Sequence, residues 1–464
     1  MSRPNILYIM TDDHAAHAMT CYGSVINETP NMDRIADGGM RLDTCLCTNS
    51  ICAPSRATIL TGLYSHREGN GVLTLEERFD GRNRTFPQML QGEGYQTAVI
   101  GKWHLGHGGN ADPTGFDYWN VLPGQGDYHN PKMFTMGEET QYEGYVTDLI
   151  TDFSLDWLQK RDADRPFCLL THHKAPHRRW EPDETHAAMF ADREIPEPPT
   201  FNDDYSNRSQ AAAHATMRID RDLTDHDCKG PVPDGLTPEE AKSWKYQRYM
   251  KDYLACVQSV DTNIGRMLDY LDETGLADDT VVIYTSDQGF FLGDHGWYDK
   301  RFFYEESLRM PFVARYPKEI KPGSVSDAMV LNVDFAPLIL DYAGIPVPGD
   351  MDGQSCRSIL AGDTPGDWRD IMYYRYFMHL SHHGVCAHYG VRTDRYKLIH
   401  YYLDDPLPPE WELFDLEKDP MEMRNVICDP AYADVVEDLK HELFAMQKDL
   451  GDTDTVWPGA AKHV

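Results

Sequence analysis

Short apolar runs that end abruptly in polar residues constrain the fold of this chain more than any other feature. Four such runs occupy residues 6–10, 97–100, 167–170 and 281–284. A run of this length without polar alternation is typical of a strand buried on both faces, as in a parallel sheet. Because ligands of an open α/β sheet bind outside the carboxyl ends of its strands, we expect the polar residues that follow the four runs to meet in one crevice.

Helical patterns between these runs complete the prediction of an α/β layer fold. Apolar residues recur at helical spacing over 246–271, where Gly275 follows as a stop, and again over 146–158. Thr29-Pro30 offers an N-cap and a first helical position for a shorter helix. We therefore expect a large, mostly parallel sheet sandwiched by helices.

The C-terminal part of the chain has a different texture. From residue 363 onward, short strand-like segments alternate with turn residues, and a helical pattern follows over 435–450. These features predict a small antiparallel sheet with a closing helix. Because 464 residues exceed the usual size of one core, we predict two domains, 1–362 and 363–464. Residues 196–237 lack apolar periodicity and predict a long surface insertion.

Charge and cysteine usage exclude several kinds of partner. The formal net charge of −32 argues against binding to nucleic acid or to an anionic membrane. The N-terminal residues lack the pattern of a secretory signal, and no apolar stretch is long enough to cross a bilayer. The ten cysteines show neither a disulfide rhythm nor a zinc spacing. We therefore expect a cytoplasmic protein with mostly reduced thiols, and the sequence leaves a homo-oligomer open.

Two of the strand ends carry groups that suit a hard cation. Asp12 and Asp13 follow the first run, and Asp287 and Gln288 follow the last. Oxygen ligands of this kind bind Ca²⁺ or Mg²⁺. A lone pair of acids in a loop is more often a solvated turn, but four polar strand ends together favour a metal site.

A second cluster lies around Cys52, in the pentad Cys52-Ala53-Pro54-Ser55-Arg56. Pro54 suits the first turn of a helix, where unpaired N–H groups and the helix dipole favour an anion. Arg56 lies about one helical turn on and can reach the same anion. The alternative is that Cys52 is a buried small hydrophobe, as free cysteines often are. A thiolate is also a soft ligand that matches an oxygen-lined calcium site poorly.

The wider motif, Cys-x-Pro-Ser-Arg-x-x-x-Leu-Thr-Gly over residues 52–62, resembles the signature of type I sulfatases of the alkaline-phosphatase superfamily. The resemblance implies an alkaline-phosphatase-like fold and hydrolysis of sulfate esters. It also implies that a maturation enzyme, acting on the unfolded chain, converts Cys52 to formylglycine. The hydrate of formylglycine provides an oxygen ligand and nucleophile, which would remove the mismatch with the metal.

The resemblance also assigns roles to individual residues. Asp12, Asp13, Asp287 and Gln288 match the metal ligands, together with the converted Cys52, and the ion would be Ca²⁺ with Mg²⁺ as the alternative. Arg56, Lys102 and Lys300 match positions that hold the nucleophile and the sulfate oxygens. His177 matches the histidine beside the leaving group and is assigned as general acid, and His104 matches the histidine that accepts a proton in the second step. Many relatives have Asn or His where this chain has Gln288.

The substrate class follows from two further stretches. Residues 290–317 and 388–398 resemble the branch that includes N-acetylglucosamine-6-sulfatases, which implies a carbohydrate sulfate. With no export signal in the sequence, we expect a small sulfated saccharide or another small ester. We also expect the C-terminal domain to close the pocket, with His383, His388 and Arg395 as substrate contacts.

Three other functions stay open from the sequence. A phosphonate monoester or phosphodiester hydrolase, or a promiscuous arylsulfatase, shares the fold and can share the cysteine motif. The third possibility is a protein that binds sulfated ligands with its metal but does not catalyse. The nucleophile and the acid in this sequence argue against it, because binding alone requires neither.

Overall fold

A ten-stranded sheet forms the centre of the molecule. The computed structural model describes residues 3–404 and 406–452. The strand order in the sheet is β13-β2-β12-β9-β1-β8-β4-β5-β6-β7. In this order the strands are Ser324–Ser326, Met40–Leu42, Phe312–Arg315, Thr280–Ser286, Asn5–Thr11, Phe167–His172, Gln96–Lys102, Tyr118–Leu122, Lys132–Thr135 and Glu138–Gln141.

The four predicted runs are confirmed as neighbouring strands. β9, β1, β8 and β4 lie side by side and pair in parallel, so their carboxyl ends share one edge of the sheet. The partners of β1 are far away in the chain: Thr11 lies opposite Ser286 on one side and Met10 opposite His172 on the other. β5 extends the parallel group beyond β4, whereas β12 beside β9 and β6 beside β5 are antiparallel to those neighbours.

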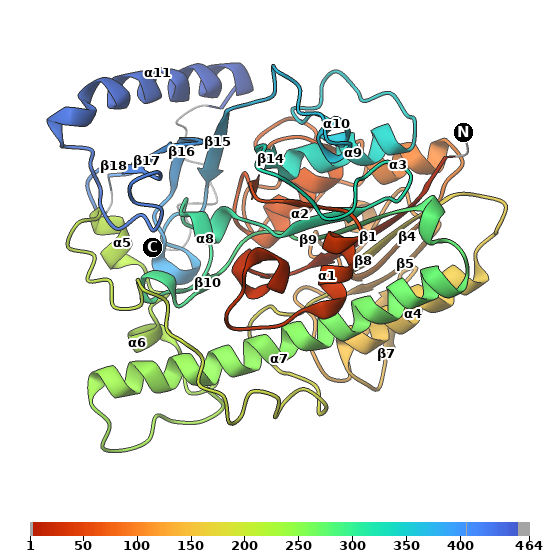
Figure 1. The fold of residues 1–464 in the computed structure, drawn as a ribbon, viewed down its shortest axis with the longest axis horizontal. Coiled ribbons are helices and arrows are strands. Elements are labelled where there is room, and N and C mark those ends of the chain that lie inside the picture. The colour runs from red at the N-terminus through yellow and green to blue at the C-terminus, as the bar shows by residue number, and fades with distance from the viewer. Residues whose placement is uncertain (1–2, 405, 453–464) are drawn as a thin grey trace.

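Helices cover both faces of the sheet, as predicted (Figure 1). Successive side chains of a strand point to opposite faces of the sheet, and the sequence of β1 is apolar on both faces. Leu7 and Ile9 belong to one buried cluster, and Ile6, Tyr8 and Met10 belong to another. The first cluster contains apolar residues of α1 (Pro30–Asp37), α4 (Val146–Lys160) and α7 (Pro238–Glu273). The second contains apolar residues of α2 (Cys52–Thr61), α3 (Phe86–Gly92), α9 (Phe335–Tyr342) and α10 (Arg357–Leu360).

The long helix α7 begins earlier than its apolar stripe predicted. Thr237 caps it by accepting a hydrogen bond from the backbone of Glu240, whose carboxylate accepts one from the backbone of Thr237. Pro238 occupies the first turn, where its missing N–H costs nothing. The first turns lie outside the core, so only the capping residues signal where this helix starts.

A small antiparallel sheet is present near the C-terminus, as predicted. Its strands are β15 (Ile371–Tyr376), β16 (His388–Thr393), β17 (Tyr396–Tyr401) and β18 (Glu410–Asp415), and α11 (Ala433–Leu450) packs on it. Figure 1 shows this unit beside the large sheet. The domain boundary at 362/363 stays a prediction.

Several short elements belong to neither of the two sheets. They are β3 (Cys45–Leu46), β14 (Val330–Leu331), β10 (Phe291–Leu292), β11 (Tyr298–Asp299), α5 (Gln210–His214), α6 (Ile219–Asp222) and α8 (Glu305–Leu308). Within 196–237, the helices α5 and α6 bury Ala211, Ala212 and Ile219, and the backbone N–H of Ser209 donates to Glu412 of β18. This segment therefore joins the core to the small sheet.

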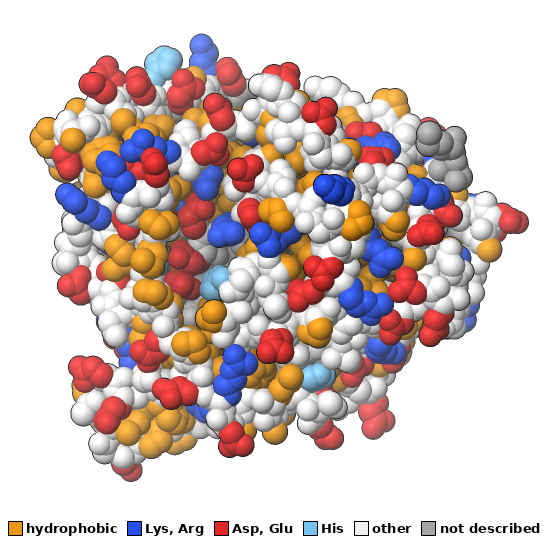
Figure 2. All heavy atoms as spheres, viewed as in Figure 1, with side chains coloured by type: hydrophobic (Ala, Val, Ile, Leu, Met, Phe, Trp, Pro, Cys, Tyr) orange, Lys and Arg blue, Asp and Glu red, His pale blue; other side chains and the backbone are white. Residues whose placement is uncertain are grey.

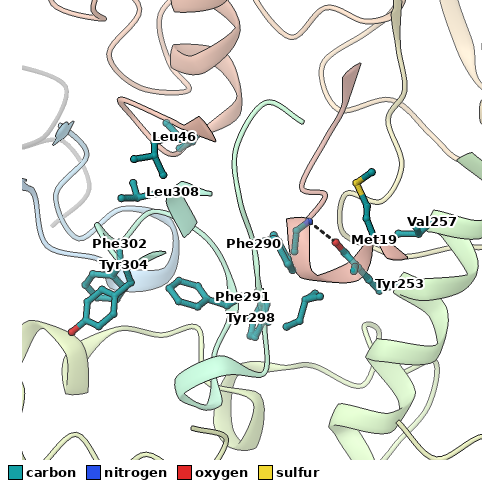
Figure 3. Packing of buried hydrophobic residues seen from close by; sticks show 14 of the residues in the cluster. Met19, Leu46, Tyr253, Val257, Phe290, Phe291, Tyr298, Phe302, Tyr304 and Leu308 are labelled. Carbon is teal, nitrogen blue, oxygen red and sulfur yellow. Dashed lines mark hydrogen bonds between the residues drawn. The ribbon is translucent and has the colours of Figure 1, made fainter. Parts of the chain in front are cut away.

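An aromatic segment around β10 and β11 links the two sheets. Figure 3 shows Phe290, Phe291, Phe302 and Tyr304 among the buried residues of this region. Phe303 stacks on Tyr374 of β15 with ring centres 4.5 Å apart. The small sheet is therefore held against the loops that follow β9.

Acidic and basic side chains are interspersed over the face of the molecule that Figure 2 shows, although the chain as a whole is strongly acidic.

Of the helices that the structure describes, none combines the length and the apolar character that crossing a bilayer requires.

Candidate active site

Three carboxylates converge where β1 and β9 end. The pairing of Thr11 with Ser286 places Asp12 and Asp13 next to Asp287, although 274 residues separate Asp13 from Asp287. All three side chains are buried, and one oxygen of each lies within 4.8 Å of the others. Burial, opposed by the ammonium of Lys300, raises the pKa of Asp13 to about 6. The three oxygens therefore lie close enough together to coordinate one cation.

The backbone of this loop is fixed from the long helix. Asp13 has a positive φ of 68°, an unusual conformation for a residue with a side chain. The hydroxyl of Tyr253 on α7 donates to the Asp13 carbonyl at 2.9 Å and accepts from the N–H of Ala15 at 3.0 Å. Figure 3 shows Tyr253 with a hydrogen bond at its hydroxyl. Helix α7 therefore holds the two carboxylates of the loop in place.

Cys52 is the first residue of α2 and points at the same centre. Its Sγ lies 3.2 Å from Oδ1 of Asp12, and the residue is 1% exposed. Burial raises the pKa of the thiol to about 12, so the side chain is protonated and unreactive as a thiol. A helix N-terminus nonetheless favours negative charge at this position.

Arg56, Lys102 and Lys300 surround the carboxylates. Arg56 donates through Nε to Oδ2 of Asp287 at 2.9 Å, and Lys300 donates to both oxygens of Asp13 at 2.5 and 2.7 Å. Lys102 contacts Asp12. Burial lowers the pKa of Lys102. For Lys300, burial is opposed by Asp13, Cys52 and Asp299, which together raise the pKa. All three cations are therefore placed to share their charge with an anion bound above the carboxylates.

Two histidines lie against this centre. Nε2 of His177 is 3.7 Å from Oδ2 of Asp13, and its backbone carbonyl accepts a hydrogen bond from Tyr128 at 2.7 Å. Burial and the neighbouring ammonium groups lower the pKa of both His177 and His104 well below the usual range. His104 has a φ of 57°, and its buried Nδ1 has no hydrogen bond within 3–404 and 406–452. Both rings are therefore neutral without a bound anion.

The side chain of Gln288 indicates whether these residues suit a metal ion. Its Nε2 donates to Asp13 at 2.5 Å, while its buried Oε1 has no hydrogen-bond partner among the residues described. A half-turn of the amide presents that oxygen to the carboxylates instead. An orphaned oxygen beside three converging carboxylates fits a hard cation such as Ca²⁺ or Mg²⁺. The residues thus fit the metal that the sequence predicted, and the ion type stays a prediction.

A cavity of about 470 Å³ opens above the centre. Cys52, His177 and Lys300 line it together with residues from other loops, among them Gln125, Lys174, Arg178, Arg179, Asp299 and His383. Nε2 of His383 lies 3.3 Å from Asp299, which attaches the C-terminal part of the wall to the loop that carries Lys300. The volume is typical of a site for a small molecule.

Comparisons with known proteins decide the family. The profile of the sulfatase family matches residues 4–345, and that of the N-sulphoglucosamine sulphohydrolase C-terminal region matches residues 293–449. The chain belongs to the sulfatase family. This sulfatase is a sulfuric ester hydrolase, and the predicted family, activity and fold are confirmed.

Individual relatives cover nearly the whole sulfatase chain. It is 45% identical to an N-acetylglucosamine-6-O-sulfatase of Bacteroides thetaiotaomicron, over 97% of this chain and 88% of the relative. A solved structure of a protein in complex with its substrate D-glucosamine-2-N,6-O-disulfate matches with a TM-score of 0.93 and 44% identity, over 98% and 99% of the two chains. The phosphonate monoester hydrolase of Agrobacterium radiobacter matches with a TM-score of 0.76 at 22% identity, over 97% and 96%, which shows a common fold alone.

The structure corrects two predicted substrate contacts of the sulfatase. His388 is 0% exposed, with its ring among Phe302, Tyr376 and Tyr401 and its Nε2 accepting from the Phe303 backbone at 3.1 Å. Its role is to pack the small sheet, and burial lowers its pKa to about 4.

Arg395 is the second correction. It lies in the turn between β16 and β17, where its guanidinium forms a two-point pair with Asp415 at 3.0 and 3.1 Å and contacts Glu417. It does not line the cavity. Of the three predicted contacts, only His383 lies at the wall.

Sequence reasoning also missed several residues of the sulfatase site. Lys174, Arg178 and Arg179 line the cavity, and they stand within three residues of His177, so their place in the chain could have identified them. Gln125, which contacts Lys102, comes from a loop with no such signal. Tyr253 belongs to the apolar stripe of α7, and nothing in that pattern reveals the task of its hydroxyl.

Proposed function

We propose that this sulfatase removes the 6-O-sulfate from a glucosamine unit of a small saccharide, with formylglycine at position 52 and Ca²⁺ at the carboxylates. The observation that carries the proposal is the 45% identity, over 97% of the chain, to an N-acetylglucosamine-6-O-sulfatase. The cavity above Cys52 supports it, because its size suits a monosaccharide or disaccharide end and its base is cationic.

The residues at the base of the cavity are placed to bind a sulfate ester. Lys102, Lys300 and His177 surround the space next to Cys52, where they would hold the sulfate oxygens and stabilise charge as the ester bond breaks. A Ca²⁺ held by Asp12, Asp13, Asp287 and Gln288 would supply further positive charge at the same oxygens. Arg56, tied to Asp287 and to the carbonyl of Lys102, would keep the cationic wall rigid.

His177 is the proposed proton donor to the leaving alcohol. Burial, together with the ammonium groups of Lys102 and Lys300, lowers the pKa of His177 and disfavours its charged form. A bound sulfate ester brings negative charge to the same place, which raises the pKa of His177 toward the range needed for a general acid. His104, next to Lys102 and Arg56, is the proposed acceptor of the proton that returns in the second half of the reaction.

Position 52 requires chemical conversion for this function. The thiol has a raised pKa and is a soft ligand beside hard oxygen donors. Formylglycine at this position would supply a hydrated aldehyde, which is an oxygen nucleophile. Because Cys52 is 1% exposed, we infer that the maturation enzyme acts before α2 packs against the sheet.

The proposed function is tested with a matched set of esters. The purified chain, co-produced with a formylglycine-generating enzyme, is incubated with N-acetylglucosamine 6-sulfate, N-acetylglucosamine 3-sulfate, an aryl sulfate and an aryl phosphonate monoester. We expect sulfate release from the 6-sulfate with a kcat/KM at least about 100-fold above the other three, since a misplaced ester cannot reach the base of the cavity. Faster turnover of the phosphonate ester or the 3-sulfate would reject the proposal.

A further inference from the structure

One buried cation at the cavity wall has no task in the reaction described above. Lys174 follows β8 and is 3% exposed. Among residues 3–404 and 406–452, its ammonium has neither a hydrogen-bonded nor an ion-paired partner, and it lies 4.6 Å above the centre of the Tyr128 ring. Burying an ammonium group without a partner is costly, so the fold maintains this arrangement against a penalty.

The other buried cations of the centre differ from Lys174 in this respect. Lys102 and Lys300 each contact a carboxylate of the strand ends, and Arg56 pairs with Asp287. Lys174 lines the same cavity, yet no carboxylate lies within ion-pair distance of it among the described residues, although Asp127 and Glu181 border the cavity too. Burial lowers the pKa of Lys174 to about 8, which leaves most of the population charged at neutral pH.

A second cation extends this part of the wall toward solvent. The side chain of Arg179 is 50% exposed and lies 3.8 Å from Asp227, whose carboxylate is already held by Arg178 at 2.6 and 2.7 Å. Among the residues that the structure describes, Asp227 is the ion-pair partner of Arg179, which therefore retains unused donors. Buried Lys174 and half-exposed Arg179 both line the cavity and provide it with two cations.

We propose that Lys174 and Arg179 form a second anion subsite, which binds an anionic substituent of the saccharide other than the sulfate that is removed. This inference rests on the proposed function, since it assumes a sugar ester in the cavity. The chemistry that fits is an oxyanion, either an N-sulfate on the same glucosamine or the carboxylate of an attached uronic acid. Tyr128 holds the ammonium by its ring, and its hydroxyl holds the carbonyl of His177, so the two subsites share one rigid support.

The experiment compares substrates that differ in one anion. They are N-acetylglucosamine 6-sulfate, glucosamine N,6-disulfate, and N-acetylglucosamine 6-sulfate joined to a uronic acid. The variants are Lys174→Met, Lys174→Arg and, as a control for loss of one positive charge, Lys132→Met on the exposed strand β6. Sulfate release gives kcat and KM, and thermal unfolding checks that each variant folds.

We expect wild type to prefer one of the doubly anionic substrates, and the preferred one identifies the source of the anion. For that substrate, Lys174→Met should raise KM about 10- to 100-fold with kcat nearly unchanged, which corresponds to the loss of one charge-assisted contact. KM for the monosulfate should change less than about threefold. Lys174→Arg should restore most of the preference, and Lys132→Met should behave as wild type.

Other outcomes separate the failure of this inference from that of the proposed function. If wild type hydrolyses the 6-sulfates but Lys174→Met reduces turnover of all of them equally, Lys174 acts on the reacting sulfate or only supports Tyr128, and the second subsite is rejected. Equal KM values of wild type for singly and doubly anionic substrates reject it as well. If wild type hydrolyses none of the three, the proposed function has failed and this inference fails with it.

Discussion

Two buried groups of charges in this sulfatase have similar composition and different consequences. The strand-end cluster comprises Asp12, Asp13, Asp287, Arg56, Lys102 and Lys300. The joint cluster, between α8 and the small sheet, comprises Glu305, Arg392, Lys397 and Glu422. In the joint cluster Lys397 lies 2.7 Å from Glu422 and 2.9 Å from Glu305, and Arg392 lies 3.1 Å from Glu305. In both clusters each cation has a protein carboxylate as its partner, so the two differ in their surroundings and not in their pairing.

The difference shows that burial of charge does not by itself indicate a functional site. In the part of the chain that the structure describes, the acidic, histidine and cysteine groups with a geometry suited to a metal occur at the strand-end cluster and not at the joint cluster. Both clusters border a cavity, since Glu305 and Arg392 line one of about 450 Å³, so a cavity does not distinguish them. The strand-end cluster differs because it combines the converging carboxylates with Cys52. We therefore expect substitutions at the strand ends to remove activity and substitutions at the joint to remove stability.

The largest expected effect is that of Cys52→Ala. Removing the residue that becomes the nucleophile should lower kcat/KM by about 10⁴-fold or more, whereas the unfolding midpoint should stay near that of wild type. Sulfate release and urea unfolding measure the two quantities. Cys428→Ala, which removes an exposed thiol, is the control and should change neither. Full activity of Cys52→Ala would refute the mechanism.

Metal removal should have the second-largest effect on activity. Dialysis against a chelator should reduce turnover about 100-fold or more, because charge stabilisation worth several kcal/mol is lost from the sulfate oxygens. Ca²⁺ should restore more activity than Mg²⁺, since Mg²⁺ demands a stricter geometry. Asp13→Asn should prevent the recovery. A chelated enzyme that keeps its rate, with metal content checked by mass spectrometry, would contradict the site.

Lys397→Met should produce the opposite pattern in the joint cluster. Lys397 is 0% exposed, and its removal leaves two buried carboxylates with one cation fewer, which should lower the free energy of unfolding by about 3–5 kcal/mol. Below the unfolding transition, kcat/KM should remain within about threefold of wild type. A double variant with Glu422→Gln should recover part of the stability. Loss of kcat in a folded Lys397→Met protein would contradict the separation of the two clusters, because the joint cluster would then contribute to catalysis.

The smallest effect is expected for Arg395→Ala. The Arg395 guanidinium lowers the pKa of Asp415 to about 2, below the usual value of roughly 3.9 in an unfolded chain. This pair therefore stabilises the fold at neutral pH, and the contribution disappears as the pH falls from about 4 to 2. Because the pair is near the surface, we expect only a small loss of stability at pH 7, which disappears once the pH falls below about 2. KM should not change, and a rise in KM would restore Arg395 as a substrate contact.

The sequence predicted the centre of the site because one rule governs it. Strands that are buried and parallel end at a common edge, so Asp12, Lys102, His177 and Asp287 could be expected to meet from their positions alone. The residues that line the cavity come from several loops, and no comparable rule predicts their positions. His388 occupies a strand position that looks suitable for a ligand, but the aromatic segment at Phe302 fills that space. Arg395 has a partner across a turn, Asp415, and only the folded turn reveals the pair. Lys174 belongs to the same motif as His177, but the motif does not indicate that its side chain lines the cavity.

The central position of β1 has a consequence for synthesis of the protein. This strand leaves the ribosome before its two neighbours, β8 and β9, and Ser286 pairs with Thr11 across 275 residues. At roughly 5–20 residues per second, the apolar segment waits roughly 15 to 55 s for its last neighbour. During that interval it requires shielding from other nascent chains. The same delay keeps position 52 reachable for a modifying enzyme, long after that residue has been translated.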